Sequence, residues 1–169
     1  MTPILEAWNV AEPDSAVTAL NHCCASRRWA EGVMALRPFD NPNSLFIAAD
    51  QVWATMAEPD WMEAFSAHPR IGERRATQAS ETSAAWSSQE QSAVASAQAR
   101  VLEELAEGNR RYEELFGFTY IVCATGKSAN EMLAILQRRL SSTHETELRE
   151  AAEQQRQITQ IRLRKWLEL

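Results

Sequence analysis

Residues 101–124 read VLEELAEGNRRYEELFGFTYIVCA, and this stretch decides the fold class. Apolar side chains recur in it at three- and four-residue spacing, which predicts one face of a long helix over residues 88–116. Gly108 falls on this apolar stripe, where glycine costs about 1 kcal/mol relative to alanine. We expect close approach of another helix, or a slight bend, to offset that cost. The stripe consists of Val94, Ala97, Val101, Leu105, Tyr112 and Leu115.

The end of the same stretch, residues 119–124, has the β-branched and aromatic content of a strand. It is too short and isolated to make a sheet, so we expect an extended connection that crosses the core. The next helix is predicted over 128–141, where Ser128 and Glu131 match a capping box. Two long helices joined by a short crossing segment should pack antiparallel.

The glycines and prolines of the chain also indicate helices. There are only five glycines, and prolines stand at expected helix starts such as Pro13, Pro42 and Pro59. The sequence therefore predicts an all-α fold, a compact single-domain helical bundle over residues 1–169. We expect about seven to nine helices and one short extended crossing segment. A polar loop is expected over 72–86. The other expected helices cover 13–24, 27–36, 42–57, 59–67 and 144–167.

Composition excludes several classes of partner. The formal net charge is −6 with no basic block, so neither nucleic acid nor an anionic membrane is an expected partner. No apolar run approaches the roughly 20 residues that span a bilayer, and the N-terminus does not resemble a signal peptide. Three cysteines are not a disulfide framework, which favours a reducing, cytoplasmic compartment.

A second informative stretch is HPRIG, residues 68–72. Proline disfavours the helical conformation in the residue before it, so His68 should follow a helix end on a stiff turn. An imidazole held there is reachable and titrates near neutrality, which suits proton transfer. The alternative is a structural role, because a cation at a helix C-terminus complements the helix dipole.

Two further positions carry polar groups in places that suit a ligand. Ser87 and Glu90 match a capping box at the expected start of the long helix, where backbone N–H groups can bind an anionic or carbonyl-rich ligand. Arg162 lies on the same helical face as Gln155 and Ile158. A guanidinium on an inward face either meets an acceptor or extends to solvent. The structural alternatives are capping for Glu90 and extension to solvent for Arg162.

Other patterns do not make sites. Gly126-Lys127-Ser128 resembles the end of a phosphate-binding loop, but Ile121 stands where that motif needs glycine. The three histidines are far apart in sequence and no pair has helical metal-ligand spacing, so we expect no metal.

Eight segments, spread over nearly the whole chain, are informative together: Trp29-Ala30, Arg37-Pro38-Phe39, HPRIG at 68–72, Glu90-Gln91, YEELFGF at 112–118, IVCA at 121–124, GKS at 126–128 and ITQIRL at 158–163. In their order and spacing, these segments resemble the 2-oxo-4-hydroxy-4-carboxy-5-ureidoimidazoline (OHCU) decarboxylase family. Thr119 and Thr125 depart from the residues common in that family, and both flank the crossing segment.

The resemblance implies an all-α homodimer that converts OHCU to (S)-allantoin in urate degradation without a cofactor. His68 would be the catalytic acid or base, with Glu90 and Arg162 as further catalytic residues. The substrate-binding residues would be Pro69, Ser87, Gln91, Ile121, Val122, Cys123, Ala124 and Thr125.

Two other classes stay open. One is a helical binding module without catalysis, in which the same residues are caps and surface charges. The other is a ring-opening hydrolase of purine breakdown. In the decarboxylase or in the hydrolase, the 72–86 loop is a candidate lid.

Overall fold

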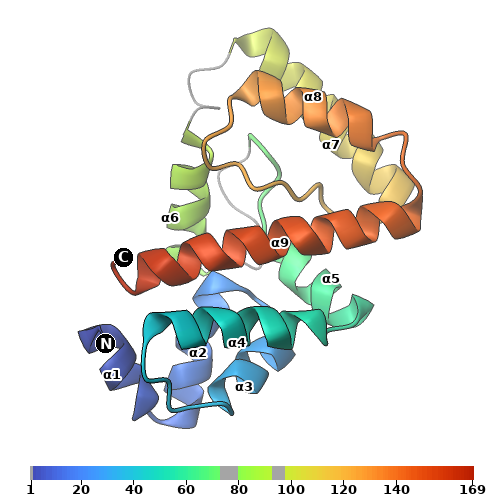
Figure 1. Cartoon of the computed structure of the whole chain (residues 1–169). Helices are drawn as coiled ribbons and strands as arrows, with labels where there is room; N and C mark the ends of the chain where they lie inside the picture. The colour runs from blue at the N-terminus through green and yellow to red at the C-terminus, as the bar shows by residue number, and fades with distance from the viewer. Residues whose placement is uncertain (1, 73–79, 93–97) are drawn as a thin grey trace. The chain divides into compact units, whose positions relative to one another are not determined.

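The computed structural model describes residues 2–72, 80–92 and 98–169, and within these ranges the chain forms nine helices and no strand (Figure 1). The all-α prediction and its expected number of helices are therefore confirmed. No described helix has both the length and the apolar character needed to cross a membrane. The helices are α1 (Pro3–Asn9), α2 (Pro13–Cys23), α3 (Arg27–Met34), α4 (Pro42–Ala54), α5 (Glu58–Ser66), α6 (Glu81–Glu90), α7 (Ala99–Phe116), α8 (Ala129–Arg139) and α9 (His144–Trp166).

Capping residues explain where most of these helices begin. The Asn41 side chain accepts a hydrogen bond from the Ser44 N–H, and Pro42 occupies the first turn of α4. Ser128 and Glu131 form the predicted capping box, with N···O distances of 3.1 and 2.7 Å. Hydrogen bonds from Ser128 lower the pKa of the Glu131 carboxyl. The sequence analysis missed α1, although Thr2 caps it.

The region around α6 differs from its prediction. Residues 81–86, expected in a loop, are the first part of α6, and Ser80 caps this helix by accepting a hydrogen bond from the Ser83 N–H at 3.1 Å. The long helix begins at Ala99 rather than at residue 88. The Ser87–Glu90 capping box is therefore wrong, because both residues lie in the last turns of α6. Residues 73–79, which are part of the proposed lid, lie outside the described residues, and so do residues 93–97, which include two members of the apolar stripe.

Gly108 allows α7 and α8 to approach closely, as predicted. A Cβ atom at this position would lie 2.6 Å from Cδ2 of Leu136, a fully buried side chain on α8. The antiparallel prediction is wrong, because α7 and α8 run in the same direction (Figure 1). The physical reason is the length of the crossing segment. An extended chain of about ten residues covers roughly 33 Å, enough to return along a helix such as α7, which is about 27 Å long.

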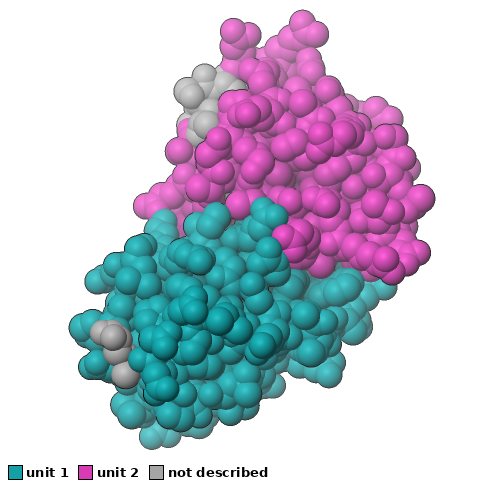
Figure 2. Space-filling model, viewed as in Figure 1, with its two compact units in different colours: residues 1–64, 156–169 teal, residues 65–155 magenta. Residues whose placement is uncertain are grey.

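The chain divides into two compact units, which Figure 2 shows in different colours. The first comprises residues 1–64 and 156–169, and the second comprises residues 65–155. In the first unit, the buried Trp29 indole donates a hydrogen bond to the Ala49 carbonyl at 3.0 Å. In the second, Tyr112 stacks against a cluster of aromatic rings that includes Phe116, Phe118 and Tyr120. That the whole chain is a single domain stays a prediction.

Candidate functional site

His68 lies just beyond the end of α5, as the His-Pro pair predicts. The helix ends at Ser66, and the His68 N–H then donates to the Phe65 carbonyl at 3.1 Å. The imidazole is half-buried and Pro69 is buried. The turn therefore holds the ring off the helix axis without hiding it from a ligand.

The imidazole has a partner that the sequence analysis did not assign. Its Nε2 atom lies 2.7 Å from Oε1 of Gln155, whose side chain is fully buried in α9. The two residues are 87 positions apart in the chain, and both belong to the unit of residues 65–155. The helical period had placed Gln155 on an inward face, which was the one available signal.

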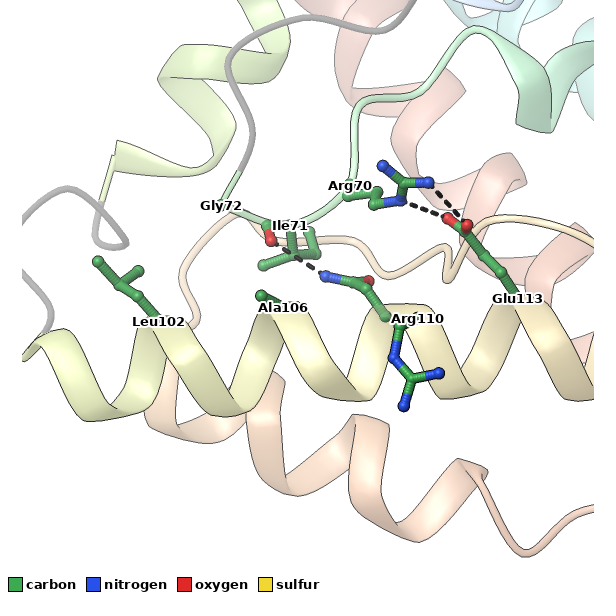
Figure 3. Close-up of a pocket in the computed structure, with 8 residues that line it drawn as sticks. Arg70, Ile71, Gly72, Leu102, Ala106, Arg110 and Glu113 are labelled. Carbon is green, nitrogen blue, oxygen red and sulfur yellow. Dashed lines mark hydrogen bonds and ion pairs between the residues drawn. The ribbon is translucent and has the colours of Figure 1, made fainter.

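The residues that follow His68 are fixed to neighbouring elements of the same unit. The Arg70 guanidinium makes a bidentate ion pair with the Glu113 carboxylate of α7, at 2.7 and 2.8 Å (Figure 3). Asn109 donates to the Ile71 carbonyl at 3.1 Å, and the Gly72 N–H donates to Oε1 of Gln91 at 3.0 Å. The structure therefore brings the predicted residue Gln91 beside the 68–72 segment.

A cavity of about 320 Å³ lies between this segment and α7 (Figure 3). Its lining contains none of the residues predicted to act in catalysis or substrate binding. It is formed by Arg70, Ile71, Gly72, Leu102, Ala106, Asn109, Arg110 and Glu113.

The crossing segment is buried from Tyr120 to Ala124, and much of its backbone is already hydrogen-bonded. The Cys123 N–H donates to Oε1 of Gln154 at 2.8 Å, and the Cys123 carbonyl accepts from Lys127 Nζ at 2.8 Å. The Ile121 carbonyl accepts from Arg139 at 2.7 Å. The Ala124 carbonyl also accepts from the Lys127 N–H at 3.0 Å. These four bonds leave fewer backbone groups of residues 121–125 to bind a substrate than the sequence predicts.

A buried ion pair supports the crossing segment from α8 and α9. Arg139 Nε lies 2.8 Å from Oε2 of Glu147, and these side chains are only 5 % and 1 % exposed. The Tyr112 hydroxyl donates to the same carboxylate oxygen at 2.5 Å. Burial, reinforced by the Glu147 carboxylate, raises the pKa of Tyr112 well above its usual range. This cluster holds the Ile121 peptide from one side through Arg139.

The remaining predicted residues lie in two places. Ser87 is buried and Glu90 is half-buried at the C-terminal end of α6, so neither presents a helix N-terminus to a ligand. Arg162 belongs to the other unit and is 4 % exposed, which rules out extension to solvent. Its charge acts on two buried thiols of that unit. Burial raises the pKa of Cys23 to about 12 and that of Cys24 to about 11, and Arg162 partly opposes both shifts.

The described ranges contain no group of three or more His, Cys, Asp or Glu side chains that could hold a metal ion. The imidazole of His68 has the buried amide of Gln155 as a hydrogen-bonding partner. A ring held in this way can exchange a proton with a small polar ligand.

Comparisons with known proteins show which family the chain resembles. The model of the OHCU decarboxylase family matches residues 9–164. The chain is 38% identical over 144 residues to the uric acid degradation bifunctional protein TTL of Arabidopsis thaliana, covering 85% of this chain but only 44% of that protein. It is 28% identical over 161 residues to the 2-oxo-4-hydroxy-4-carboxy-5-ureidoimidazoline decarboxylase of Haloferax volcanii, covering 94% and 93% of the two chains.

Solved structures show the same similarity. The fold matches a crystal structure of OHCU decarboxylase in the presence of (S)-allantoin with a TM-score of 0.78 and 32% sequence identity. The match covers 94% of this chain and 100% of that one.

Proposed function

Because this chain belongs to the OHCU decarboxylase family, we propose that it converts 2-oxo-4-hydroxy-4-carboxy-5-ureidoimidazoline to (S)-allantoin in urate degradation. The observation that carries the proposal is the placement of His68 beyond α5, with its imidazole bonded to a buried amide at 2.7 Å. The relatives named above support the substrate and the pathway. Because they match nearly the whole chain, they support a shared decarboxylase activity and not only a shared fold.

In the proposed reaction, the protein does not have to accept the electron pair that decarboxylation releases. Breaking the carbon–carboxylate bond releases carbon dioxide and leaves an electron pair on a ring carbon. The neighbouring C=N and carbonyl groups of the substrate can accept that pair, so the substrate supplies its own electron sink. No pyridoxal phosphate or thiamine is then required. The protein has to orient the carboxylate, stabilise the anion and deliver a proton to one face.

His68 is the proposed proton-transfer group. It can remove the proton of the substrate hydroxyl or protonate the carbanion, because an imidazole can both accept and donate a proton. A well-placed acid or base of this kind contributes about 10²–10⁴ in rate. Delivery from a ring fixed on one side of the substrate makes the product a single enantiomer.

The other proposed residues bind and orient the substrate. Glu90 is proposed to bond the ureido or hydroxyl group from the end of α6, with Ser87 and Gln91 supporting it. Arg162 is proposed to contact a carbonyl or carboxylate oxygen through its planar guanidinium. Pro69 is proposed as part of the pocket wall.

In the crossing segment, the proposed contacts fall on the backbone groups that the protein does not already use. Three groups, at Ile121 and Cys123, are bonded internally. The Ala124 carbonyl is bonded internally as well, because it accepts from the Lys127 N–H at 3.0 Å. The proposed substrate contacts are therefore the peptide groups of Val122 and Thr125 and the N–H of Ala124. We further propose that the protein acts as a homodimer in the cytoplasm.

The decisive experiment generates OHCU freshly from urate, adds the protein, and follows optical activity by circular dichroism, since spontaneous decay gives racemic allantoin. The chain should produce optically active (S)-allantoin, and His68→Ala should abolish this while keeping the parent far-ultraviolet spectrum. His22→Ala is the matched control in the other unit and should retain activity. Full activity in His68→Ala would refute the assigned role of this histidine.

The same assay separates the alternatives. A binding module would leave racemic product in every sample. A ring-opening hydrolase would consume substrate without releasing carbon dioxide, which can be measured directly. Either result would replace the proposed function.

A further inference from the structure

We propose that Gln155 is a positioning residue, which fixes the orientation of the His68 ring and holds the neutral imidazole in the tautomer with hydrogen on Nε2. Its consequence for catalysis rests on the proposed function. The hydrogen bond itself does not, and it can be tested without substrate.

The argument starts from the geometry of this contact. The amide oxygen of Gln155 lies 2.7 Å from His68 Nε2, and an oxygen can only accept, so Nε2 donates. In a neutral imidazole, a proton on Nε2 leaves the lone pair on Nδ1. Gln155 therefore decides which ring nitrogen is basic.

Burial makes this contact selective. The Gln155 side chain is fully buried, and a hydrogen bond lost from a buried amide oxygen is costly in a low-dielectric interior. The opposite tautomer would place two acceptors, a ring lone pair and the amide oxygen, against each other. Both effects favour the Nε2–H form over the other tautomer.

The residue before Gln155 strengthens the assignment. Gln154 bonds the Cys123 N–H at 2.8 Å, while Gln155 bonds His68 at 2.7 Å. Two adjacent side chains of one helix thus support the proposed acid–base group and the proposed substrate-binding segment. A site placed on a rigid helix keeps the separation of its parts better than one placed on loops.

The first test reads the tautomer directly, by nitrogen nuclear magnetic resonance of protein labelled with ¹⁵N-histidine. The chain has three histidines, and the His68 signals are those missing from His68→Ala. At alkaline pH, where the ring is neutral, the parent should show a protonated Nε2 and an unprotonated Nδ1. Gln155→Met should give a mixture of tautomers. Gln137→Met, the same substitution at an exposed position of α8, should resemble the parent.

Gln155→Glu provides the rescue, because a carboxylate oxygen still accepts from Nε2 and should restore the tautomer. Thermal melting of each variant confirms that it is folded before its spectrum is compared. A protonated Nδ1 in the parent, or an unchanged tautomer in folded Gln155→Met, would overturn the proposal.

The second test is kinetic. Gln155→Met should lower kcat by about tenfold or more, up to the 10²–10⁴ that a well-placed acid–base group supplies. KM should change much less, since Gln155 is not proposed to touch the substrate. A tautomer mixture with parental kcat would overturn the positioning role. An inactive parent with the expected tautomer would instead refute the proposed function and leave the hydrogen bond intact.

Discussion

Replacing Arg139 with methionine should destabilise the folded chain by about 3–5 kcal/mol, because it leaves a charge buried without its partner. Arg139 and Glu147 are 5 % and 1 % exposed, and their closest atoms are 2.8 Å apart. The substitution keeps much of the aliphatic volume, so the loss reports on the charge and its hydrogen bonds rather than on a cavity.

The expected magnitude has two parts. The Glu147 carboxylate loses its counter-ion and keeps the hydrogen bond from the Tyr112 hydroxyl, at 2.5 Å. The Ile121 carbonyl loses the donor at 2.7 Å, and an unsatisfied buried acceptor costs about 1–3 kcal/mol. Adding Glu147→Gln removes the first part and keeps the second. The double variant should therefore be more stable than Arg139→Met alone.

Urea unfolding followed by tryptophan fluorescence measures these differences, with the six tryptophans as probes. Arg149→Met is the matched control, since the Arg149–Glu145 pair on α9 is 74 % and 76 % exposed. An exposed pair of this kind contributes between 0 and about 1 kcal/mol. The reasoning would be refuted if Arg139→Met and Arg149→Met had equal effects, or if the second substitution further destabilised Arg139→Met.

Three further results are expected. Burial raises the pKa of both tyrosines, Tyr112 and Tyr120, so absorbance at 295 nm should show no tyrosinate near pH 10 until the protein unfolds. The stability that comes from keeping these hydroxyls protonated is complete below about pH 10 and is lost as pH rises through the raised pKa values. Reversible titration of the folded protein near pH 10 would contradict this prediction. All three thiols, Cys23, Cys24 and Cys123, are buried, so Ellman's reagent at pH 8 should react with them only in guanidinium chloride; rapid labelling of the native protein would show that they are accessible. A metal chelator should leave decarboxylation unchanged, since the substrate accepts its own electrons, and a loss of rate that added metal restores would argue for the hydrolase alternative.

Local signals in the sequence predicted the fold well where each signal has a single reading. Proline and an N-cap define the start of α4, and Ser128 with Glu131 defines the start of α8. The prediction for the α6 region was wrong because serine caps helices at either position, and the local sequence favours Ser87, which Glu90 follows at the capping-box spacing. Ser80 is the residue that caps α6.

The prediction that α7 and α8 are antiparallel was wrong for a different reason. A short connection was taken to reverse the chain, but the crossing segment is extended and covers a helix length. Its buried position depends on partners such as Arg139 and Gln154, which lie 18 and 31 residues from the carbonyl and amide that they bind. No local pattern encodes contacts at that separation.

For the candidate site too, local features could be predicted and long-range contacts could not. The position of His68 just beyond α5 could be predicted because the His-Pro pair fixes the local backbone. Its bond to Gln155 could not, since a helical period assigns a residue to a face and not to a partner. For Glu90, the residue type gave a hypothesis while its setting at a helix start was wrong.

The adjacent amides of Gln154 and Gln155 also constrain how this chain can change its length. Successive residues of an α-helix differ by about 100° in direction and 1.5 Å in height. One residue inserted into α9 just before Gln154 would turn both amides away from Cys123 and His68 together. Insertions near these glutamines should therefore be tolerated poorly, whereas changes of length in the connection before α9 leave their mutual register intact.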